Sequence, residues 1–164
     1  MDKTKQKIAF SFLIAIFLAA FEGVVVSTAA PVIVKSLHNF KMISWIFSIF
    51  LLTSAISTPI YGKLADLYGR KRIFMIGISI FLFGSLLAGL SQTMHQLIIF
   101  RGIQGIGAGA IFTIGFTMIG DIFTLEERSI IQGAISTIWG IAGLVGPLLG
   151  GFLIDYLSWQ WIFL

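Results

Sequence analysis

Two charged residues lie inside long apolar stretches of the chain, where side chains of their kind could do chemistry. Glu22 falls near the middle of the run from 8 to 34, and Arg101 falls about one turn into the run from 97 to 120. An ionised side chain at the centre of a membrane helix costs about 2.5–3.5 kcal/mol. Residues with such a cost usually contact a substrate, relay protons or pair with another charge. These two positions are therefore the first candidates for function.

Each candidate has a functional and a structural interpretation. A carboxyl group in apolar surroundings favours its protonated form, so Glu22 could load and release a proton, or it could hold a cationic substrate. The structural alternative is a carboxyl group bonded to a neighbouring helix. Arg101 shares a helix face with Gln104, Gly105 and Ala108, which suggests contact with another helix or a cavity. Its alternative is an anchor that extends to the outer interface.

The composition indicates that these residues sit in a membrane protein. Of 164 residues, 57% are hydrophobic and 11% are charged, whereas soluble domains carry about 25% charged residues. The chain has no cysteine, which excludes disulfides, thiolate metal sites and cysteine nucleophiles. His38 and His95 are expected in short solvated loops. No nucleophile–base pair and no metal-ligand spacing is present, so we expect neither an enzyme nor a metal site.

Five apolar runs are long enough to cross a hydrocarbon core of about 30 Å, which takes about 20 helical residues. Irregular structure facing lipid is not viable, and the runs lack the alternation of barrel strands, so they are expected to be helices. These helices are predicted over residues 8–34, 43–63, 73–91, 97–120 and 130–157, and a sixth is predicted to begin at Trp159. The predicted fold is an all-α integral membrane bundle.

The basic residues predict the orientation of the bundle. With the N-terminus in the cytoplasm, the outer links hold only Lys35 and Lys41. The inner segments then hold eight basic residues, namely Lys3, Lys5, Lys7, Lys63, Arg70, Lys71, Arg72 and Arg128. This asymmetry favours a cytoplasmic N-terminus. Basic residues in short links are typical of membrane topology rather than of a nucleic-acid-binding face, so the expected partner is the lipid bilayer and not nucleic acid.

The link between the second and third runs carries a spaced motif that positive charge alone does not explain. Gly62, Asp66, Gly69 and Arg70 follow each other at the spacing of the signature loop of the major facilitator superfamily, and the sequence resembles it. Leu67 departs from the motif, because a basic residue usually follows the aspartate. The stretch from Arg101 to Ala108 resembles the fourth-helix motif of the same family.

Two further stretches resemble the antiporter branches of that family. In the fifth run, Gly143, Gly146, Pro147, Gly150 and Gly151 are similar to the antiporter motif, although Ala142 stands where another glycine is frequent. The stretch 21–31 resembles the first-helix motif of the fourteen-helix drug:proton antiporters. Glu22 there replaces the more usual aspartate, and Ser27 replaces a frequent asparagine.

The resemblance implies a fold and a division of roles. It implies the first five helices, and the start of the sixth, of an N-terminal domain whose C-terminal half is missing from this chain. Glu22, Arg101 and Gln104 would serve proton coupling or substrate contact. A conformational latch would use Gly62, Asp66, Gly69, Arg70 and Asp121, and the glycines around Pro147 would form the surface that distinguishes exporters. Arg128 would either join the latch or cap a helix.

The expected function is proton-driven efflux of drug-like apolar or cationic compounds across a bacterial plasma membrane, by alternating access. The proton gradient would drive it, and no cofactor is expected. One alternative is a symporter or facilitator of the same fold, with twelve or fourteen helices in the parent. Another is an inactive truncated chain or partner subunit, because five helices and part of a sixth do not enclose a pathway alone.

Overall fold

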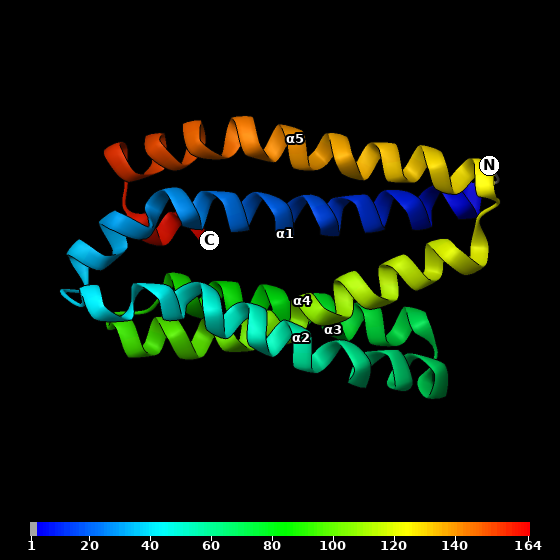
Figure 1. The fold of residues 1–164 in the computed structure, drawn as a ribbon, viewed down its shortest axis with the longest axis horizontal. Coiled ribbons are helices and arrows are strands. Elements are labelled where there is room, and N and C mark those ends of the chain that lie inside the picture. The colour runs from blue at the N-terminus through cyan, green and yellow to red at the C-terminus, as the bar shows by residue number, and fades with distance from the viewer. Residues whose placement is uncertain (1–2) are drawn as a thin grey trace.

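The computed structural model describes residues 3–164, and helices dominate it (Figure 1). The order is α1 (Lys3–Ser36), η1 (Phe40–Met42), α2 (Ile43–Tyr68), α3 (Arg70–Gly89), α4 (Met94–Ile122), α5 (Leu125–Tyr156) and η2 (Trp159–Ile162). The five α-helices are long and apolar enough to cross a membrane. No strand occurs in residues 3–164. The predicted all-α, multi-pass membrane fold is confirmed.

Several helices extend beyond the apolar runs that predicted them. α2 continues past residue 63 to Tyr68, and α5 begins at Leu125 rather than at 130. Hydropathy marks the part of a helix that lies in hydrocarbon, whereas backbone hydrogen bonds continue into the polar flanks until a stop signal ends them. α1 also begins earlier, at Lys3 rather than at 8. The shifts at the remaining ends are smaller: α3 ends at Gly89, two residues before the predicted end, and His95 lies in the first turn of α4 rather than in a loop.

Specific residues set these helix ends. Gly69 separates α2 from α3 with a φ of 89° and a ψ of 134°, a conformation open essentially to glycine alone. Thr93 accepts a hydrogen bond from the Gln96 amide at 3.3 Å and starts α4. Thr124 and Glu127 form a reciprocal capping box at the start of α5. Each cap satisfies amide groups that the first helical turn leaves without partners.

The predicted sixth helix is present only as the short 3₁₀ segment η2. Its amides bond three residues back, as in the bond from Phe163 N to Gln160 O at 3.0 Å. An α-helix is costly to nucleate, and the six residues from Trp159 to Leu164 form too few hydrogen bonds to repay that cost. Side chains hold the segment on the bundle instead. Ser85 Oγ donates to Phe163 O at 2.8 Å, and Trp159 Nε1 donates to Ser36 Oγ at 3.3 Å.

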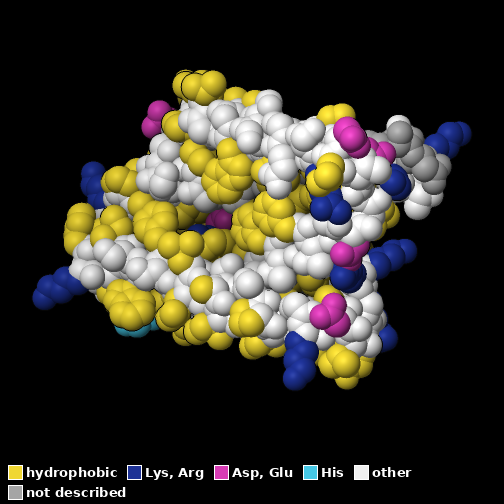
Figure 2. Space-filling model, turned by 45° about the vertical axis from the view of Figure 1, so that its right-hand side comes forward, with side chains coloured by type: hydrophobic (Ala, Val, Ile, Leu, Met, Phe, Trp, Pro, Cys, Tyr) yellow, Lys and Arg dark blue, Asp and Glu magenta, His cyan; other side chains and the backbone are white. Residues whose placement is uncertain are grey.

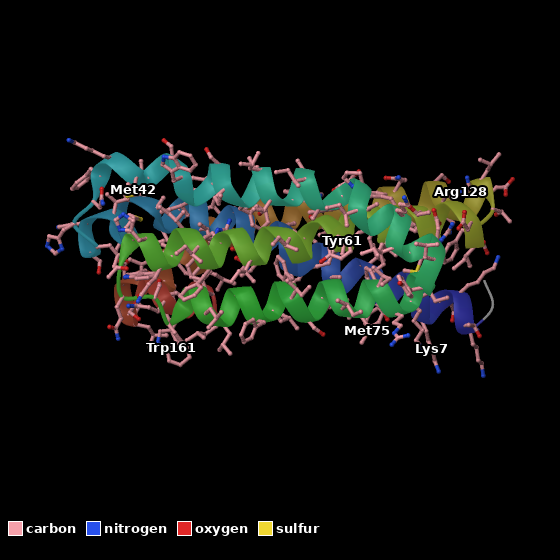
Figure 3. All side chains as sticks on the ribbon, turned by 90° about the horizontal axis from the view of Figure 1, so that it is seen from below. Lys7, Met42, Tyr61, Met75, Arg128 and Trp161 are labelled. Carbon is pink, nitrogen blue, oxygen red and sulfur yellow. The ribbon has the colours of Figure 1, made fainter. Side chains whose placement is uncertain are left out.

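The helices form two groups. α5 lies along α1, and α4 packs against both α2 and α3 (Figure 1). Contacts between α1 and α4 are sparse compared with those inside each group. The basic end of the bundle, as we call it, contains the start of α1, the α2–α3 turn and the α4–α5 turn. Figure 3 shows Lys7 and Arg128 at this end and Met42 and Trp161 at the opposite end.

Glycines allow α4 to approach its two partners closely. Gly105 and Gly109 lie against α2, where a Cβ atom would collide with Thr53 and Ser57. On the other side of α4, a Cβ on Gly84 of α3 would lie 2.6 Å from the backbone nitrogen of Gln104. Lipid supplies no hydrophobic driving force for helix association, so helices associate through van der Waals packing. Small residues at the contacts allow that packing because the backbones can approach closely. The α4 glycines are therefore packing positions, as their spacing suggests.

The glycines of α5 do not form one contact surface. A Cβ on Gly146 would lie 2.7 Å from Val24 Cγ1 of α1, and one on Gly150 would lie 3.1 Å from Val25 Cγ1. Gly140 and Gly143 have no heavy atom within 4 Å of a built Cβ. These four glycines follow one another at a spacing that places them on one helix face, and the structure divides that face into a packed half and an open half.

These glycine environments predict a contrast in stability. Gly84→Ala forces its new methyl group against the backbone of Gln104, so we expect the free energy of unfolding to fall by about 1–3 kcal/mol. Gly143→Ala is the matched control, because its methyl group meets open space and alanine favours helix. Titration of unfolding with SDS in mixed micelles measures both. Equal effects of the two substitutions would contradict the close α3–α4 contact.

Candidate functional site

The two charged residues singled out in the sequence form an ion pair inside the bundle. Arg101 Nη1 donates to Glu22 Oε1, which connects α4 to α1. Both side chains are buried, with 2% and 7% of their side-chain surface exposed. The carboxyl group is bonded to a neighbouring helix, and the guanidinium turns inward rather than extending to the interface. The pair therefore bridges the two helix groups in their apolar interior.

Three further groups surround the Arg101 guanidinium. Its Nη1 also donates to Gln104 Oε1 at 2.7 Å, and its Nε donates to Ile46 O at 3.3 Å. The Phe50 ring lies with its centroid 4.3 Å from Arg101 Cζ, within the range of a cation–π contact. The cation is thus held by α1, α2 and its own helix. This is the environment that a buried charge requires, since removal from water must be offset by partners.

Two polar atoms of the cluster remain unpaired. Within residues 3–164, Glu22 Oε2 and Gln104 Nε2 are buried without a hydrogen-bond partner. Buried polar atoms are normally paired, and exceptions often mark functional positions. One carboxylate oxygen is thus held by Arg101 while the other is available for a proton, a water molecule or a donor on a ligand. Gln104 presents an amide donor in the same cluster.

A cavity of about 400 Å³ opens beside Glu22. Apolar side chains of α1, α3, α5 and the C-terminal segment line most of it, and Glu22 and Ser85 supply polar groups. Figure 2 shows acidic and basic atoms deep in a hollow bordered by hydrophobic side chains. An apolar cavity with a single convergent carboxylate suits an apolar or cationic small molecule.

A second group of charges lies at the basic end. Arg70 Nη1 forms an ion pair with Asp121 and also donates to Thr117 O at 3.4 Å, which ties α3 to α4. These side chains are about one-third and one-half exposed. A cavity of about 590 Å³ borders the pair between α1, α3 and α4. Two of the predicted latch residues, Arg70 and Asp121, are therefore brought together.

The other predicted latch residues are arranged differently. Asp66 is exposed on α2, and no ion pair in residues 3–164 includes it. Gly69 shapes the turn that places Arg70, and a Cβ on Gly62 would make only ordinary contact with Thr113. Arg128 caps the C-terminus of α4 by donating to Phe123 O at 2.9 Å and to Gly120 O, so it acts as a helix cap.

The predicted antiporter motif lies on α5 and contributes no member of the buried pair. Gly146 and Gly150 pack on α1, one turn beyond Glu22, while Gly143 and Gly151 face open space. Pro147 lies inside α5, which continues through it. Because proline has no amide hydrogen, the carbonyl of Gly143 lacks its usual helical partner. The motif thus positions α1 on one side and leaves an unpacked helix face on the other.

Some contacts in the structure have no distinctive signal in the sequence. Phe50 and the carbonyl of Ile46 hold Arg101, but nothing distinguishes this phenylalanine from fifteen others in the sequence. The ion pair of Lys5 Nζ with Glu127 Oε2 at 3.2 Å, which joins α1 to α5, was likewise not predicted. The start of α5 did have a signal in the sequence. Thr124 and Glu127 are three residues apart before an apolar run, which is the spacing of a capping box.

The fold and the buried cluster together define a class of protein. Five spanning helices enclose an ion pair beside an apolar cavity, and charges kept inside a membrane bundle are typical of transport proteins. The sequence matches the profile of the Major Facilitator Superfamily over residues 12–164. The chain therefore belongs to this family, and the family prediction is confirmed.

Several curated relatives align with almost the whole chain. Multidrug resistance protein 3 of Bacillus subtilis is 42% identical over 99% of the chain, and multidrug transporter protein MdtP of the same species is 44% identical over 92%. Efflux pump dotC of Dothistroma septosporum is 39% identical over 92%. The aligned part makes up 33%, 28% and 26% of these relatives, so the chain spans a third or less of their length. Their names describe transporters and pumps rather than enzymes.

The buried pair predicts strong coupling between two substitutions. Arg101→Met leaves the Glu22 carboxylate buried without its cation, so we expect the free energy of unfolding to fall by about 3–5 kcal/mol. Glu22→Leu combined with Arg101→Met removes both charges and recovers most of that loss. SDS titration in micelles measures the free energy of unfolding of Glu22→Leu, Arg101→Met and the double variant. Lys63→Met removes an exposed cation as a control and changes stability by less than about 0.5 kcal/mol.

If the two residues act independently, the losses in the free energy of unfolding caused by the two single substitutions will add in the double variant. If the double variant loses as much as the sum of Glu22→Leu and Arg101→Met, the two side chains do not stabilise each other in the membrane.

Proposed function

We propose that this chain forms part of a transporter that exports apolar or cationic compounds in exchange for protons. The observation that carries the proposal is the Glu22–Arg101 pair, with one carboxylate oxygen unpaired beside an apolar cavity. The names of the multidrug relatives support export of drug-like compounds. The proposed setting is a plasma membrane with the basic end in the cytoplasm, as the distribution of lysine and arginine favours.

The chemistry of coupling follows from the charge of the pair. With Glu22 ionised, the carboxylate and the guanidinium cancel, and the site can accept a cation near Oε2. With Glu22 protonated, Arg101 remains as an uncompensated positive charge, which repels a cationic substrate. Proton and substrate therefore oppose each other's binding, as antiport requires. Inward movement of one proton at 100 mV supplies about 2.3 kcal/mol.

The latch in this proposal is the Arg70–Asp121 pair with the glycine turn beside it. An ion pair that is partly exposed contributes only about 0–1 kcal/mol, so it can break and reform during a conformational cycle. Asp66 is exposed on α2 and takes no part in that pair, so it is available to a group outside this chain. The rest of a transporter would supply the second half against which this bundle rocks.

Export is tested with a chimera in which residues 1–164 replace the matching segment of multidrug resistance protein 3. In everted vesicles with an acidic interior, a proton antiporter accumulates substrate inside in exchange for protons. A symporter or facilitator does not accumulate substrate under these conditions. We expect Glu22→Gln to abolish proton-driven accumulation while helix content is retained. Glu126→Gln, at an exposed acid, is the control and leaves it unchanged. Undiminished proton-driven export by the Glu22→Gln chimera would refute the coupling role.

The same vesicles separate the remaining alternative. If the unmodified chimera is inserted and folded but transports nothing, the chain is an inactive fragment, and the proposed function is wrong.

The latch predicts a separation of activity from stability. Arg70→Gln in the chimera should lower the transport rate by up to about fivefold, because one conformation loses a stabilising pair worth at most about 1 kcal/mol. The free energy of unfolding should change by less than about 1 kcal/mol, since the pair is partly exposed. Vesicle assays measure the transport rate, and SDS titration measures the free energy of unfolding. Lys41→Gln, at an exposed cation of the opposite end, should alter neither, and a normal rate for Arg70→Gln would remove Arg70 from the latch.

A further inference from the structure

One face of α3 is exposed along the whole length of the helix and has no partner in the bundle. Its side chains are spaced three and four residues apart, so they form a continuous stripe. The stripe consists of Arg72, Ile76, Ser79, Phe83, Leu86 and Leu90, all exposed. It is apolar except at the basic end, where Arg72 begins it, and at Ser79, whose hydroxyl donates to the Met75 carbonyl of the same helix at 3.0 Å.

The charged start of this stripe is not neutralised by the protein. Arg70 is engaged with Asp121, but in residues 3–164 neither Lys71 nor Arg72 forms an ion pair. Both side chains are exposed. No acidic residue lines the depression that both cations border, and Asp121, which shares the neighbouring cavity with Lys71, is already paired with Arg70. Two cations thus stand together at the point where the apolar face of the helix begins.

The surface at this point is concave. A depression of about 900 Å³ is bordered by Tyr68 at the end of α2, by the basic residues of the turn and by Met75 and Ile76 of α3. Tyr68 is 62% exposed and Met75 is 55% exposed. An aromatic side chain with a polar tip is typical of the interface between hydrocarbon and headgroups. The depression therefore brings together cations, an interfacial tyrosine and an apolar surface, which match the parts of a lipid molecule.

We propose that this depression binds the headgroup of an anionic phospholipid. Lys71 and Arg72 contact the phosphate, Tyr68 lies beside the glycerol region, and the stripe from Ile76 to Leu90 contacts an acyl chain. Charge complementarity selects an anionic lipid, because the two free cations would each add about equally to its binding. Continuity of the depression with a helix face that must meet hydrocarbon selects a lipid over a soluble anion.

The test uses the purified 164-residue chain in a neutral detergent and native mass spectrometry. Dioleoyl phosphatidylglycerol is compared with dioleoyl phosphatidylcholine, which has the same acyl chains and no net charge. We expect phosphatidylglycerol to bind at least tenfold more tightly to the unmodified chain. In Lys71→Gln/Arg72→Gln its binding should weaken about thirtyfold and approach that of phosphatidylcholine.

Two control variants keep the result specific. Lys35→Gln/Lys41→Gln removes the same total charge at the opposite end and should retain phosphatidylglycerol binding. Lys71→Arg/Arg72→Lys preserves both cations and should retain it as well. Circular dichroism verifies that the variants keep the helix content of the unmodified chain.

Three outcomes would overturn the proposal. Equal binding of the two lipids by the unmodified chain would show that the site does not select charge, a result that needs no variant. Unchanged phosphatidylglycerol binding in Lys71→Gln/Arg72→Gln would show that the cations serve membrane topology alone. A lipid-free dimer that this variant abolishes would assign the α3 face to a second copy of the chain.

Discussion

The ion pair between Glu22 and Arg101 is the constraint on which the rest of the bundle depends. Contacts between α1 and α4 are otherwise sparse, so the pair is a principal link between the α1–α5 and α2–α3–α4 groups. A second link lies nearer the basic end, where the ring of Phe12 fits against Gly115. In hydrocarbon neither charge has water as an alternative partner, so separating the groups would expose both. The same ion pair therefore holds the two helix groups together and forms the centre of the candidate site.

Close packing places the guanidinium where the carboxylate can meet it. Glycines on both sides of α4 bring its backbone near α2 and α3, and this approach puts Phe50 and the Ile46 carbonyl within reach of Arg101. On the other side, Gly146 lets α5 press on α1 near Glu22. Small residues thus act on the site indirectly, because they fix the distance between the helices that carry its charged groups.

The two charge clusters of the bundle have different physical character. The interior pair is buried and carries a high cost if broken, so changing its protonation changes the energy of the whole site. The Arg70–Asp121 pair is partly exposed to solvent and is cheap to break. Figure 2 shows basic and acidic side chains gathered at the basic end, away from the hollow. The two clusters therefore differ in the cost of breaking them, which is what the proposed coupling site and the proposed latch each require.

The sequence by itself determined the five helices and singled out Glu22 and Arg101 as charges inside apolar runs. Length and apolarity are local properties, and a charge inside an apolar run is visible without any neighbour. Only the tertiary structure decided what those charges touch, because a pair 79 residues apart depends on how helices rotate and pack. It separated Asp66 from the Arg70–Asp121 pair and recruited Phe50 for the same reason. It also left the segment from Trp159 to Ile162 as a 3₁₀ turn, since that segment has few backbone hydrogen bonds of its own and is held on the bundle by contacts with Ser36 and Ser85.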